Sequence, residues 1–365
     1  MINIHALLKA MVDRNSSDLH VRCRVVPIMR VNGELFKVGT DPVSPENMEA
    51  MLRTLLSQEQ YAKFQREPEL DFATMLPGVG RFRINVFRQR GTPAMAIRSI
   101  KVEIPNFSEL ALPNVIMDIS MKRRGMILVT GTTGSGKSTL LASMVDHINA
   151  STSVNIVTIE DPIEFLHRDK RSIVAQREIG TDSPNFNSAL RASFRQDPDI
   201  ILIGEMRDCE TIETAMSAAD TGHLVMSTLH TMNTTETITR IISFFPPHQH
   251  DQIRLVLSNV LVAIISLRLL PRKDGAGRIP AAEILINHAA ISEYILNPEK
   301  SHQILPAISE GHSQYGSQSF DQSLLQLYQN DMITLDIAKQ NASNPDDFEL
   351  TVRGVSGTSD RRWMV

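Results

Sequence analysis

Short apolar runs alternate with amphipathic stretches from about residue 114 onward. The apolar runs are Met126–Thr130, Asn155–Ile159, Ile200–Ile203 and Leu224–Ser227. Runs of this length without polar alternation are typical of parallel strands whose two faces are both covered by helices. Between the runs, residues 140–148 and 212–219 place their apolar side chains on one helical face. The pattern predicts an α/β domain with a parallel sheet, and the C-terminal third is more helical.

The first hundred residues have a different pattern, in which short segments of alternating apolar and polar residues predominate. Ile4, Leu7, Leu8 and Met11 recur at helical spacing, and a second helix is predicted after Ser44, which suits an N-cap before Pro45. The segments that read as strands are Leu19–Val26, Ile28–Val31, Glu34–Val38, Asp71–Met75, Arg81–Phe87 and Ala94–Ile100. With a turn at Asn32-Gly33, they predict hairpins and therefore an α+β module.

These changes in the hydrophobic pattern predict the domain boundaries. We expect an N-terminal α+β domain over 1–105, a linker over 106–113 between two prolines, an α/β domain over 114–353, and a disordered tail over 354–365. The most apolar stretch, Leu255–Leu270, is 16 residues long and includes Arg268. A membrane span needs about 20 apolar residues. We therefore expect a buried helix there and a cytoplasmic protein.

Composition and charge exclude several classes of protein. Hydrophobic residues make up 42% and charged residues 21% of the chain, which is typical of globular domains. Lysine and arginine number 37 against 41 acidic residues, so the net charge of −4 provides no general attraction to nucleic acid. Two cysteines, Cys23 and Cys209, cannot form a four-thiolate zinc site or a disulfide framework.

A glycine-rich segment follows the first apolar run and precedes the first amphipathic helix of the α/β domain. It has the spacing of a phosphate-binding loop, and its residues are Gly131, Thr132, Thr133, Gly134, Ser135, Gly136, Lys137 and Ser138. Backbone N–H groups and the helix N-terminus would surround the phosphates of ATP. Lys137 is expected to pair with the β- and γ-phosphates, Ser138 to ligate Mg²⁺, and Thr139 to lie near the α-phosphate.

Carboxylates follow two of the later strands. Glu205 ends an apolar strand at Ile200–Ile203, which is the arrangement that brings an acid beside the magnesium ion of a P-loop ATPase. After Asn155–Ile159 come Glu160, Asp161 and Glu164, any one of which could orient an attacking water molecule. The sequence by itself does not choose among these three.

Two histidines and several arginines have both a structural and a catalytic interpretation. His223 and His230 bracket the fourth strand, where a histidine is more often structural than catalytic. Arg81 and Arg83 alternate on one face of their strand, either on a solvated sheet face or as a guanidinium clamp on the γ-phosphate of a neighbouring subunit. The other arginines of these hairpins are Arg88, Arg90 and Arg98.

Four motifs together resemble those of the secretion-superfamily ATPases. GTTGSGKS, TIEDPIEF, DPDIILIGEMRD and TGHLVMSTLHT are similar, in this order, to the Walker A, aspartate-box, Walker B and histidine-box motifs. The N-terminal stretches SSDLHV and RFRINVF also resemble early motifs of the type IV pilus retraction motors of the PilT/PilU group. The resemblance covers nearly the whole chain.

The resemblance implies a homohexameric ring at the cytoplasmic face of the inner membrane, attached through an inner-membrane pilus platform protein. It implies a PAS-like N-terminal domain and a RecA-like core with ATP bound between them. Glu164 corresponds to the catalytic glutamate, Glu205 to the Walker B acid, and His223 and His230 to the histidine box. Arg81, Arg83 and Arg98 are the arginine candidates. Domain rotation driven by ATP hydrolysis would retract the pilus.

Two features narrow the subgroup. Assembly and type II secretion ATPases usually carry a longer N-terminal region and a four-cysteine motif, which this chain cannot supply. The stretch Ala290–Ile295 departs from the AIRNLI motif of PilT proteins and resembles PilU-type accessory ATPases, which cooperate with PilT. The alternatives are an assembly or type II/IV secretion ATPase, a non-hydrolysing regulatory subunit, and a RecA-like DNA motor. Four tyrosines and one tryptophan offer a DNA motor few stacking aromatics.

Overall fold

The computed structural model describes residues 2–31, 33–100, 103–275 and 277–354. The chain divides into two compact units, one of Met1–Glu103 with Glu164–Leu166 and one of Ile104–Ile163 with His167–Val365. The division falls two residues before the expected end of the N-terminal domain. The tail expected over 354–365 lies, after Gly354, outside the described residues, as does Asn32 of the expected turn.

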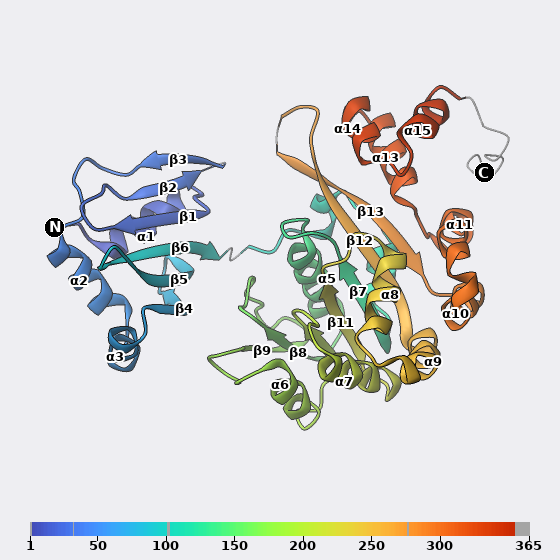
Figure 1. Cartoon of the computed structure of the whole chain (residues 1–365), viewed down its shortest axis with the longest axis horizontal. Coiled ribbons are helices and arrows are strands. Elements are labelled where there is room, and N and C mark those ends of the chain that lie inside the picture. Colours follow the sequence, from blue (N-terminus) through green and yellow to red (C-terminus); the bar gives the residue numbers. More distant parts are fainter. Residues whose placement is uncertain (1, 32, 101–102, 276, 355–365) are drawn as a thin grey trace. The chain divides into compact units, whose positions relative to one another are not determined.

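The first unit is an antiparallel sheet with helices on one of its faces (Figure 1). Its elements are α1 (Ile4–Asp13), β1 (Asp18–Arg22), β2 (Ile28–Val31), β3 (Glu34–Lys37), α2 (Pro45–Leu55), α3 (Gln58–Arg66), β4 (Glu69–Leu76), β5 (Gly80–Gln89) and β6 (Thr92–Ile100). Within the described residues the strand order is β3-β2-β1-β6-β5-β4. The predicted α+β module is confirmed.

Local sequence signals set the helices of this unit. Ser44 caps α2 by accepting a hydrogen bond from the backbone N–H of Asn47, with Pro45 in the first helical position. The apolar stripe of α1 is buried, as its spacing predicts. The helices pack against the sheet face that carries Phe82, Ile84 and Val86. The other face of β5 carries the alternate residues, including Arg81 and Arg83.

The second unit is built around a mostly parallel sheet. Its elements up to the second half of the unit are η1 (Phe107–Leu110), α4 (Val115–Ser120), β7 (Gly125–Thr130), α5 (Lys137–Ser151), β8 (Asn155–Glu160), β9 (Ile173–Glu178), α6 (Phe186–Ser193), β10 (Ile200–Ile203), α7 (Cys209–Asp220) and β11 (Leu224–Leu229). The remaining elements are α8 (Thr234–Ser243), η2 (Pro247–Gln249), α9 (His250–Val260), β12 (Leu261–Pro271), β13 (Arg278–Ile286), α10 (Ala289–Leu296), η3 (Pro298–Gln303), α11 (Ile304–Glu310), α12 (His312–Tyr315), α13 (Phe320–Gln329), α14 (Leu335–Asn341) and α15 (Pro345–Val352).

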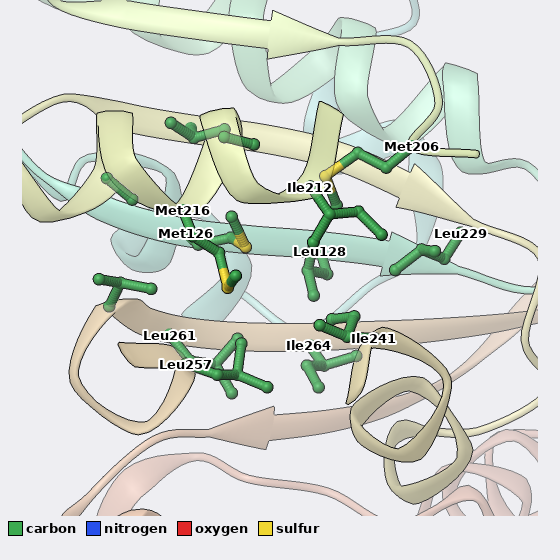
Figure 2. Close-up of a cluster of buried hydrophobic side chains, with 14 of the residues drawn as sticks. Met126, Leu128, Met206, Ile212, Met216, Leu229, Ile241, Leu257, Leu261 and Ile264 are labelled. Carbon is green, nitrogen blue, oxygen red and sulfur yellow. The ribbon is translucent and has the colours of Figure 1, made fainter. Parts of the chain in front are cut away.

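In the described part of the chain the sheet order is β13-β12-β7-β11-β10-β8-β9, parallel except at the β12–β13 hairpin. Helices α4 and α5 pack on one face, while α7, α8 and α9 pack on the other (Figure 1). Figure 2 shows the second of these interfaces, where Met126 and Leu128 of β7 meet Ile212 and Met216 of α7. Burial on both faces explains why these strands are uniformly apolar. The predicted α/β domain is confirmed.

The helix expected over Leu255–Leu270 is confirmed only as far as Val260, and the prediction is wrong for the rest of the run. The helix α9 ends at Val260, and the apolar run continues as strand β12, which pairs with β7 in parallel register. A central strand with both faces buried has the same uninterrupted apolar sequence as a buried helix, so periodicity cannot separate the two. None of the helices in the described ranges combines the length and the hydropathy that a bilayer crossing requires.

The segment expected to be a linker, residues 106–113, is packed instead. It forms the short 3₁₀ helix η1, and Phe107 is 7% exposed in the core beside α4 and α5. Leu110 and Leu112 pack against the same cluster. The two prolines break regular structure, but burial of these three side chains fixes the segment to the second unit.

Candidate functional site

The phosphate-binding loop connects the C-terminal end of β7 to the N-terminus of α5. Gly136 is the N-cap residue of α5 and has φ +99°, a backbone conformation that glycine adopts without strain. The side chain of Lys137 is buried and folds back over the loop, where Nζ donates to Gly131 O at 2.8 Å and to Thr132 O at 3.0 Å. The loop is therefore already closed around its own lysine.

The geometry of the loop is suited to a phosphate chain. A Cβ on Gly131 would lie 2.5 Å from Leu267 O and from Ser135 Oγ, so only glycine fits between β12 and the loop. Ser135 Oγ is buried and has no hydrogen-bond partner among the described residues. A buried hydroxyl without a partner is costly, and a phosphate oxygen would satisfy it. The loop thus fits the phosphates of a nucleotide.

The parallel strands bring two more predicted residues to the same edge of the sheet. Glu205 follows β10 and His230 follows β11, the strand that pairs with β7. His230 Nδ1 lies 3.5 Å from Lys137 Nζ, and His230 Nε2 lies 3.3 Å from Glu205 Oε1. The imidazole therefore bridges the lysine of the loop and the strand-end carboxylate. A group placed between these three side chains would meet a cation, an imidazole and a carboxylate.

Arg207 is a member of this chain of contacts that the sequence analysis missed. Its Nη2 lies 2.8 Å from Glu205 Oε2, and the hydrogen bond that Arg207 donates to this carboxylate raises the pKa of Arg207. The side chain of Glu205 is 19% exposed and that of Arg207 is 61% exposed. The signal that could have indicated the pair is the sequence Gly-Glu-Met-Arg directly after β10, in which the acid and the arginine are two residues apart. Arg207 holds one oxygen of Glu205, while His230 contacts the other.

The carboxylates that follow β8 have separate roles. Glu160 Oε1 accepts hydrogen bonds from Thr158 Oγ1 at 2.6 Å and from Gln176 Nε2 at 3.1 Å. Gln176 in turn accepts from the backbone N–H of His167 at 2.8 Å. Because Glu160 is committed to these contacts on β8 and β9, it supports the loop that follows the strand. We assign it a structural role in preference to an activation of water.

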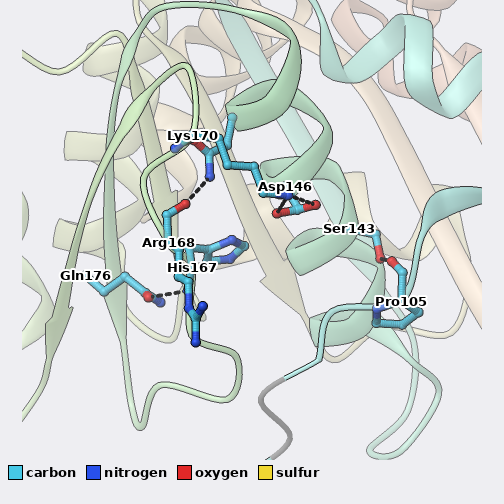
Figure 3. A network of polar contacts seen from close by, with 8 residues as sticks. Pro105, Ser143, Asp146, His167, Arg168, Lys170 and Gln176 are labelled. Atoms are coloured by element: carbon cyan, nitrogen blue, oxygen red, sulfur yellow. Dashed lines mark hydrogen bonds and ion pairs between the residues drawn. The ribbon is translucent and has the colours of Figure 1, made fainter.

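The loop 167–171 is tied to α5, the helix that begins at Lys137. Asn149 Nδ2 donates to Arg168 O at 2.7 Å, and Lys170 Nζ lies 2.7 Å from Asp146 Oδ1 (Figure 3). Figure 3 also shows Ser143 on the same helix, which donates to Pro105 O at 2.8 Å. Burial lowers the pKa of His167 to about 4, so its ring is neutral at physiological pH. These contacts fix the loop that leads away from Glu164.

Glu164 itself is exposed and lies in the segment Glu164–Leu166, which is grouped with the first unit. Its neighbours Ile163 and Phe165 are buried. Glu164 is therefore an exposed residue between two buried ones. An exposed carboxylate is available to bind a water molecule or a ligand.

The structure places His223 apart from the other predicted site residues of the second unit. His223 precedes β11, whereas His230 follows it, and the intervening strand of Leu224–Leu229 spans about 20 Å. His223 lies at the edge of the sheet where β7 begins, and its Nδ1 is 3.0 Å from Ala218 O. Two histidines that bracket a strand necessarily lie at opposite edges of the sheet.

The three arginine candidates share one face of the first unit's sheet. Arg83 and Arg98 are directly opposite each other on β5 and β6, and Arg81 lies two residues from Arg83. Arg98 Nε lies 3.0 Å from Asp18 Oδ1. Arg83 and Arg98 repel each other as like charges directly opposite on neighbouring strands, and Asp18 offsets part of the charge at Arg98.

These features define a P-loop nucleotide-binding protein, and three comparisons with known proteins agree. A family model described as "Type II/IV secretion system protein" matches residues 2–294. The chain is 39% identical to the type IV pilus ATPase PilU of Pseudomonas aeruginosa, over 95% of this chain and 90% of PilU. It is also 39% identical to the retraction ATPase PilT of that organism, over 95% of this chain and 100% of PilT.

Among solved structures, a crystal structure of the pilus retraction motor PilT with bound ADP matches with a TM-score of 0.88 and 42% identity. The match covers 96% of this chain and 99% of that one. The chain belongs to the type II/IV secretion system protein family. It is an ATPase with the RecA-like fold of the secretion ATPases, and it binds nucleotide.

Proposed function

We propose that the chain is an ATP-hydrolysing motor of type IV pilus retraction. The observation that supports this proposal best is that His230 contacts both Lys137 and Glu205 at the edge of the sheet where the phosphate-binding loop lies. The relatives named PilU and PilT extend over 95% of the chain, so the proposal concerns the whole protein. The motor works as a homohexamer at the cytoplasmic face of the inner membrane, peripheral to it through an inner-membrane pilus platform protein.

The residues divide the catalytic work among them. The nine residues Gly131 to Thr139 bind the phosphates, and Lys137 exchanges its two loop carbonyls for β- and γ-phosphate oxygens. Ser138 and Glu205 offer the oxygen donors that Mg²⁺ prefers, and the ion would neutralise charge on the phosphates. Glu164 orients the attacking water molecule. His230 sits against the γ-phosphate between Lys137 and Glu205.

The arginines complete the site from another subunit. Arg81, Arg83 and Arg98 lie on one sheet face, and they act as a clamp on the γ-phosphate of a neighbouring subunit. Loss of that phosphate on hydrolysis removes the anion that holds the clamp. Rotation of the two units against each other is then the mechanical output. His223, at the opposite edge of the sheet, has no part in this step within its own chain.

We assign the chain a PilU-like accessory role beside a PilT ATPase. Equal identity to PilU and PilT does not favour either assignment. The support comes from helix α10. In it, Ser292 and Glu293 stand where the AIRNLI motif of PilT proteins has an arginine and an asparagine. Ser292 Oγ donates to Ser258 O at 3.1 Å, and Glu293 pairs with Lys300. An arginine in place of Ser292 and an asparagine in place of Glu293 would not form this hydroxyl hydrogen bond and this ion pair.

Retraction imaging tests the proposal directly. Cells that lack both retraction ATPases receive this chain alone, a PilT alone, or both. We expect retraction with both, slower or weaker retraction with PilT alone, and none with this chain alone. Lys137→Ala in this chain should remove its contribution because the variant cannot bind ATP. Equal retraction with and without this chain would refute the motor role, and retraction by this chain alone would refute the accessory role.

Biochemical assays separate the remaining alternatives. Steady-state phosphate release from the purified chain distinguishes a hydrolysing motor from a regulatory subunit. Filter binding to single-stranded DNA at moderate salt distinguishes a DNA motor, for which tight and salt-sensitive binding is expected. Restored pilus extension or secretion in cells lacking an assembly or secretion ATPase would instead favour that class.

A further inference from the structure

A cluster of buried hydroxyls lies beneath the phosphate-binding loop. It consists of Thr130, Thr231, Thr237 and Ser266, which we call the hydroxyl cluster. Each is at most 3% exposed. Thr130 is the last residue of β7, directly before Gly131, and Thr231 directly follows His230. Neither the proposed catalytic roles nor the core packing requires polar groups here.

The cluster joins the two segments that carry the site. Thr130 Oγ1 and Ser266 Oγ lie 2.7 Å apart, across the register pair of β7 and β12. On the other side, Thr231 Oγ1 and Thr237 Oγ1 lie 2.6 Å apart. Thr237 Oγ1 also reaches Thr130 Oγ1 at 3.5 Å. Thr237, on helix α8, is therefore the hydroxyl that contacts both the root of the phosphate-binding loop and the segment after His230.

Helix α8 is itself held in place at its first turn. Glu283 of β13 is buried, and its Oε1 accepts from Thr234 N and from Thr234 Oγ1, both at 2.8 Å. Thr237 Oγ1 donates to Asn233 O at 2.7 Å, and the side chain of Asn233 caps the helix by accepting from Glu236 N. The N-terminus of α8 is thus fixed to the sheet independently of the loop. A rigid support is what a positioning contact requires.

Hydroxyls in this place cost more than their apolar equivalents would. Valine has nearly the shape of threonine and needs no hydrogen bond, whereas a buried hydroxyl must be satisfied. The directional contacts of the cluster define distances between segments that apolar packing would leave looser. The cluster affects the distance of 3.5 Å between Lys137 Nζ and His230 Nδ1. Thr130 precedes the loop that leads to Lys137, and Thr231 directly follows His230.

We propose that Thr237 is a positioning residue for catalysis, which holds His230 against Lys137 and the γ-phosphate through Thr231 and Thr130. The inference rests on the proposed role of His230 at the nucleotide. Loss of the Thr237 hydroxyl leaves the phosphate-binding loop and its affinity for ATP in place. It lets the His230 segment shift, so the chemical step slows.

The test is Thr237→Val in the full chain, assayed for phosphate release over a range of ATP concentrations with Mg²⁺ present. We expect kcat to fall about tenfold, because misplacement of a catalytic group by a fraction of an ångström has effects of this order or larger. We expect KM and the affinity for a fluorescent ATP analogue to stay within about twofold. Thr237→Ser, which keeps the hydroxyl, should recover most of the activity.

Two further variants separate positioning from general stability. Ser193→Ala removes another fully buried hydroxyl, which donates to Leu190 O on α6, and it should retain parental kcat. His230→Ala is measured alone and with Thr237→Val under single-turnover conditions with excess enzyme, where slow rates remain measurable. Positioning predicts that Thr237→Val adds little to the loss from His230→Ala.

Each result has a definite meaning. If Thr237→Val keeps the parental kcat, or if its effect multiplies fully with that of His230→Ala, the positioning role is wrong. An equal loss of ATP affinity and kcat, or failure of Thr237→Ser to recover activity, also contradicts it. If His230→Ala itself hydrolyses ATP at the parental rate, the proposed role of His230 fails, and the inference for Thr237 fails with it. The two failures are therefore distinguishable.

Discussion

Lys137 shows how single residues prepare this site. Its ammonium group occupies the loop by donating to two backbone carbonyls and approaching His230. A buried ammonium without partners would be very unfavourable, so the loop carbonyls stabilise the lysine until phosphate oxygens replace them. In the proposed function, binding of ATP would exchange these hydrogen bonds of Lys137 for hydrogen bonds to phosphate oxygens.

The carboxylate of Glu205 should be needed for turnover and not for binding. Glu205→Gln keeps the size of the side chain but removes the charge that attracts Mg²⁺ and that faces His230 and Arg207. We expect phosphate release to fall at least about a hundredfold, with the affinity for ATP within about threefold of the parent. Glu210→Gln, an exposed residue paired with Arg191 on α6, is the matched control and should hydrolyse ATP normally. Parental turnover by Glu205→Gln would remove it from the site.

Gly131 and Gly134 allow a test of the loop geometry itself. Both have positive φ, +140° and +78°, but only at Gly131 does an added Cβ meet backbone, at 2.5 Å from Leu267 O. Gly134→Ala carries only a conformational cost of about 1 kcal/mol. Gly131→Ala must also displace β12 or the loop, so we expect a lower melting temperature and at least a tenfold loss of ATP affinity. Thermal melting and nucleotide titration measure both effects. Equal effects of the two variants would show that β12 does not pack closely against the loop at Gly131.

At the scale of elements, parallel strands determine which motifs meet. The sequence predicts that Lys137 and Glu205 follow strands of one sheet, and parallel pairing then places them at one edge. The same rule excludes His223, which precedes β11. The two histidines of the motif lie at opposite ends of one strand, so only His230 lies beside the phosphate-binding loop of its own chain. Strand direction contains this information, and sequence spacing alone does not.

Other elements could not be predicted from pattern. Strand β12 is as apolar as a buried helix would be, and its partners β7 and β13 decide its conformation. The hydroxyls of Thr130 and Thr237 have no sequence signature, because they are 107 residues apart and meet only through the fold. Arg207 lies within a recognised motif, yet its pairing with Glu205 depends on the turn after β10. Local signals such as the Ser44 cap are predictable because the interaction spans three residues.

The loop after β8 should couple stability to pH through His167. Burial lowers the pKa of His167 to about 4, whereas an unfolded histidine has a pKa of about 6.5. The unfolded state therefore takes up a proton first as the pH falls, and the contribution is lost between about pH 6.5 and 4. We expect the free energy of unfolding to fall by about 2 kcal/mol between pH 7 and pH 5 from this group. Urea denaturation at both values measures it.

Two variants isolate this contribution from other titrating groups. His167→Gln removes the titrating ring and should reduce the pH dependence by about that amount. His248→Gln replaces an exposed histidine in η2 and should leave the pH dependence as in the parent. An unchanged slope in His167→Gln would mean that His167 is solvated in the folded protein and that the loop is not packed as described.

At the scale of the whole molecule, the residues proposed for ATP hydrolysis are divided between two units of the chain. The phosphate-binding loop, Glu205 and His230 lie in the second unit, and Arg81, Arg83 and Arg98 lie in the first. A site that needs both units can report the state of the nucleotide as a relative motion of the units. If the units come from different subunits, the same division couples neighbours in a ring, and a closed ring uses one heterologous interface repeatedly.

Mixing two inactive variants tests whether Arg83 acts across such an interface. Subunits with Lys137→Ala keep Arg83 but cannot bind ATP, and subunits with Arg83→Ala bind ATP but lack the clamp. In a mixed ring, a complete site forms wherever the phosphate-binding loop of an Arg83→Ala subunit faces a Lys137→Ala neighbour. Random one-to-one mixing makes about a quarter of the interfaces complete. We therefore expect roughly that fraction of parental phosphate release to return on mixing, although each variant alone is nearly inactive.

Arg88 provides the control for Arg83 because the two residues lie on opposite faces of β5. Arg88 lies on the same strand as Arg83 but on the other face, where its guanidinium covers the ring of Phe64. Arg88→Ala should therefore hydrolyse ATP like the parent, and it separates loss of the clamp from loss of positive charge on β5. If Arg83 acts within its own subunit, every intact loop in the mixture lacks its arginine and no activity returns. If Arg83→Ala is fully active alone, the arginine face is solvated surface, and the clamp must be sought elsewhere on the first unit.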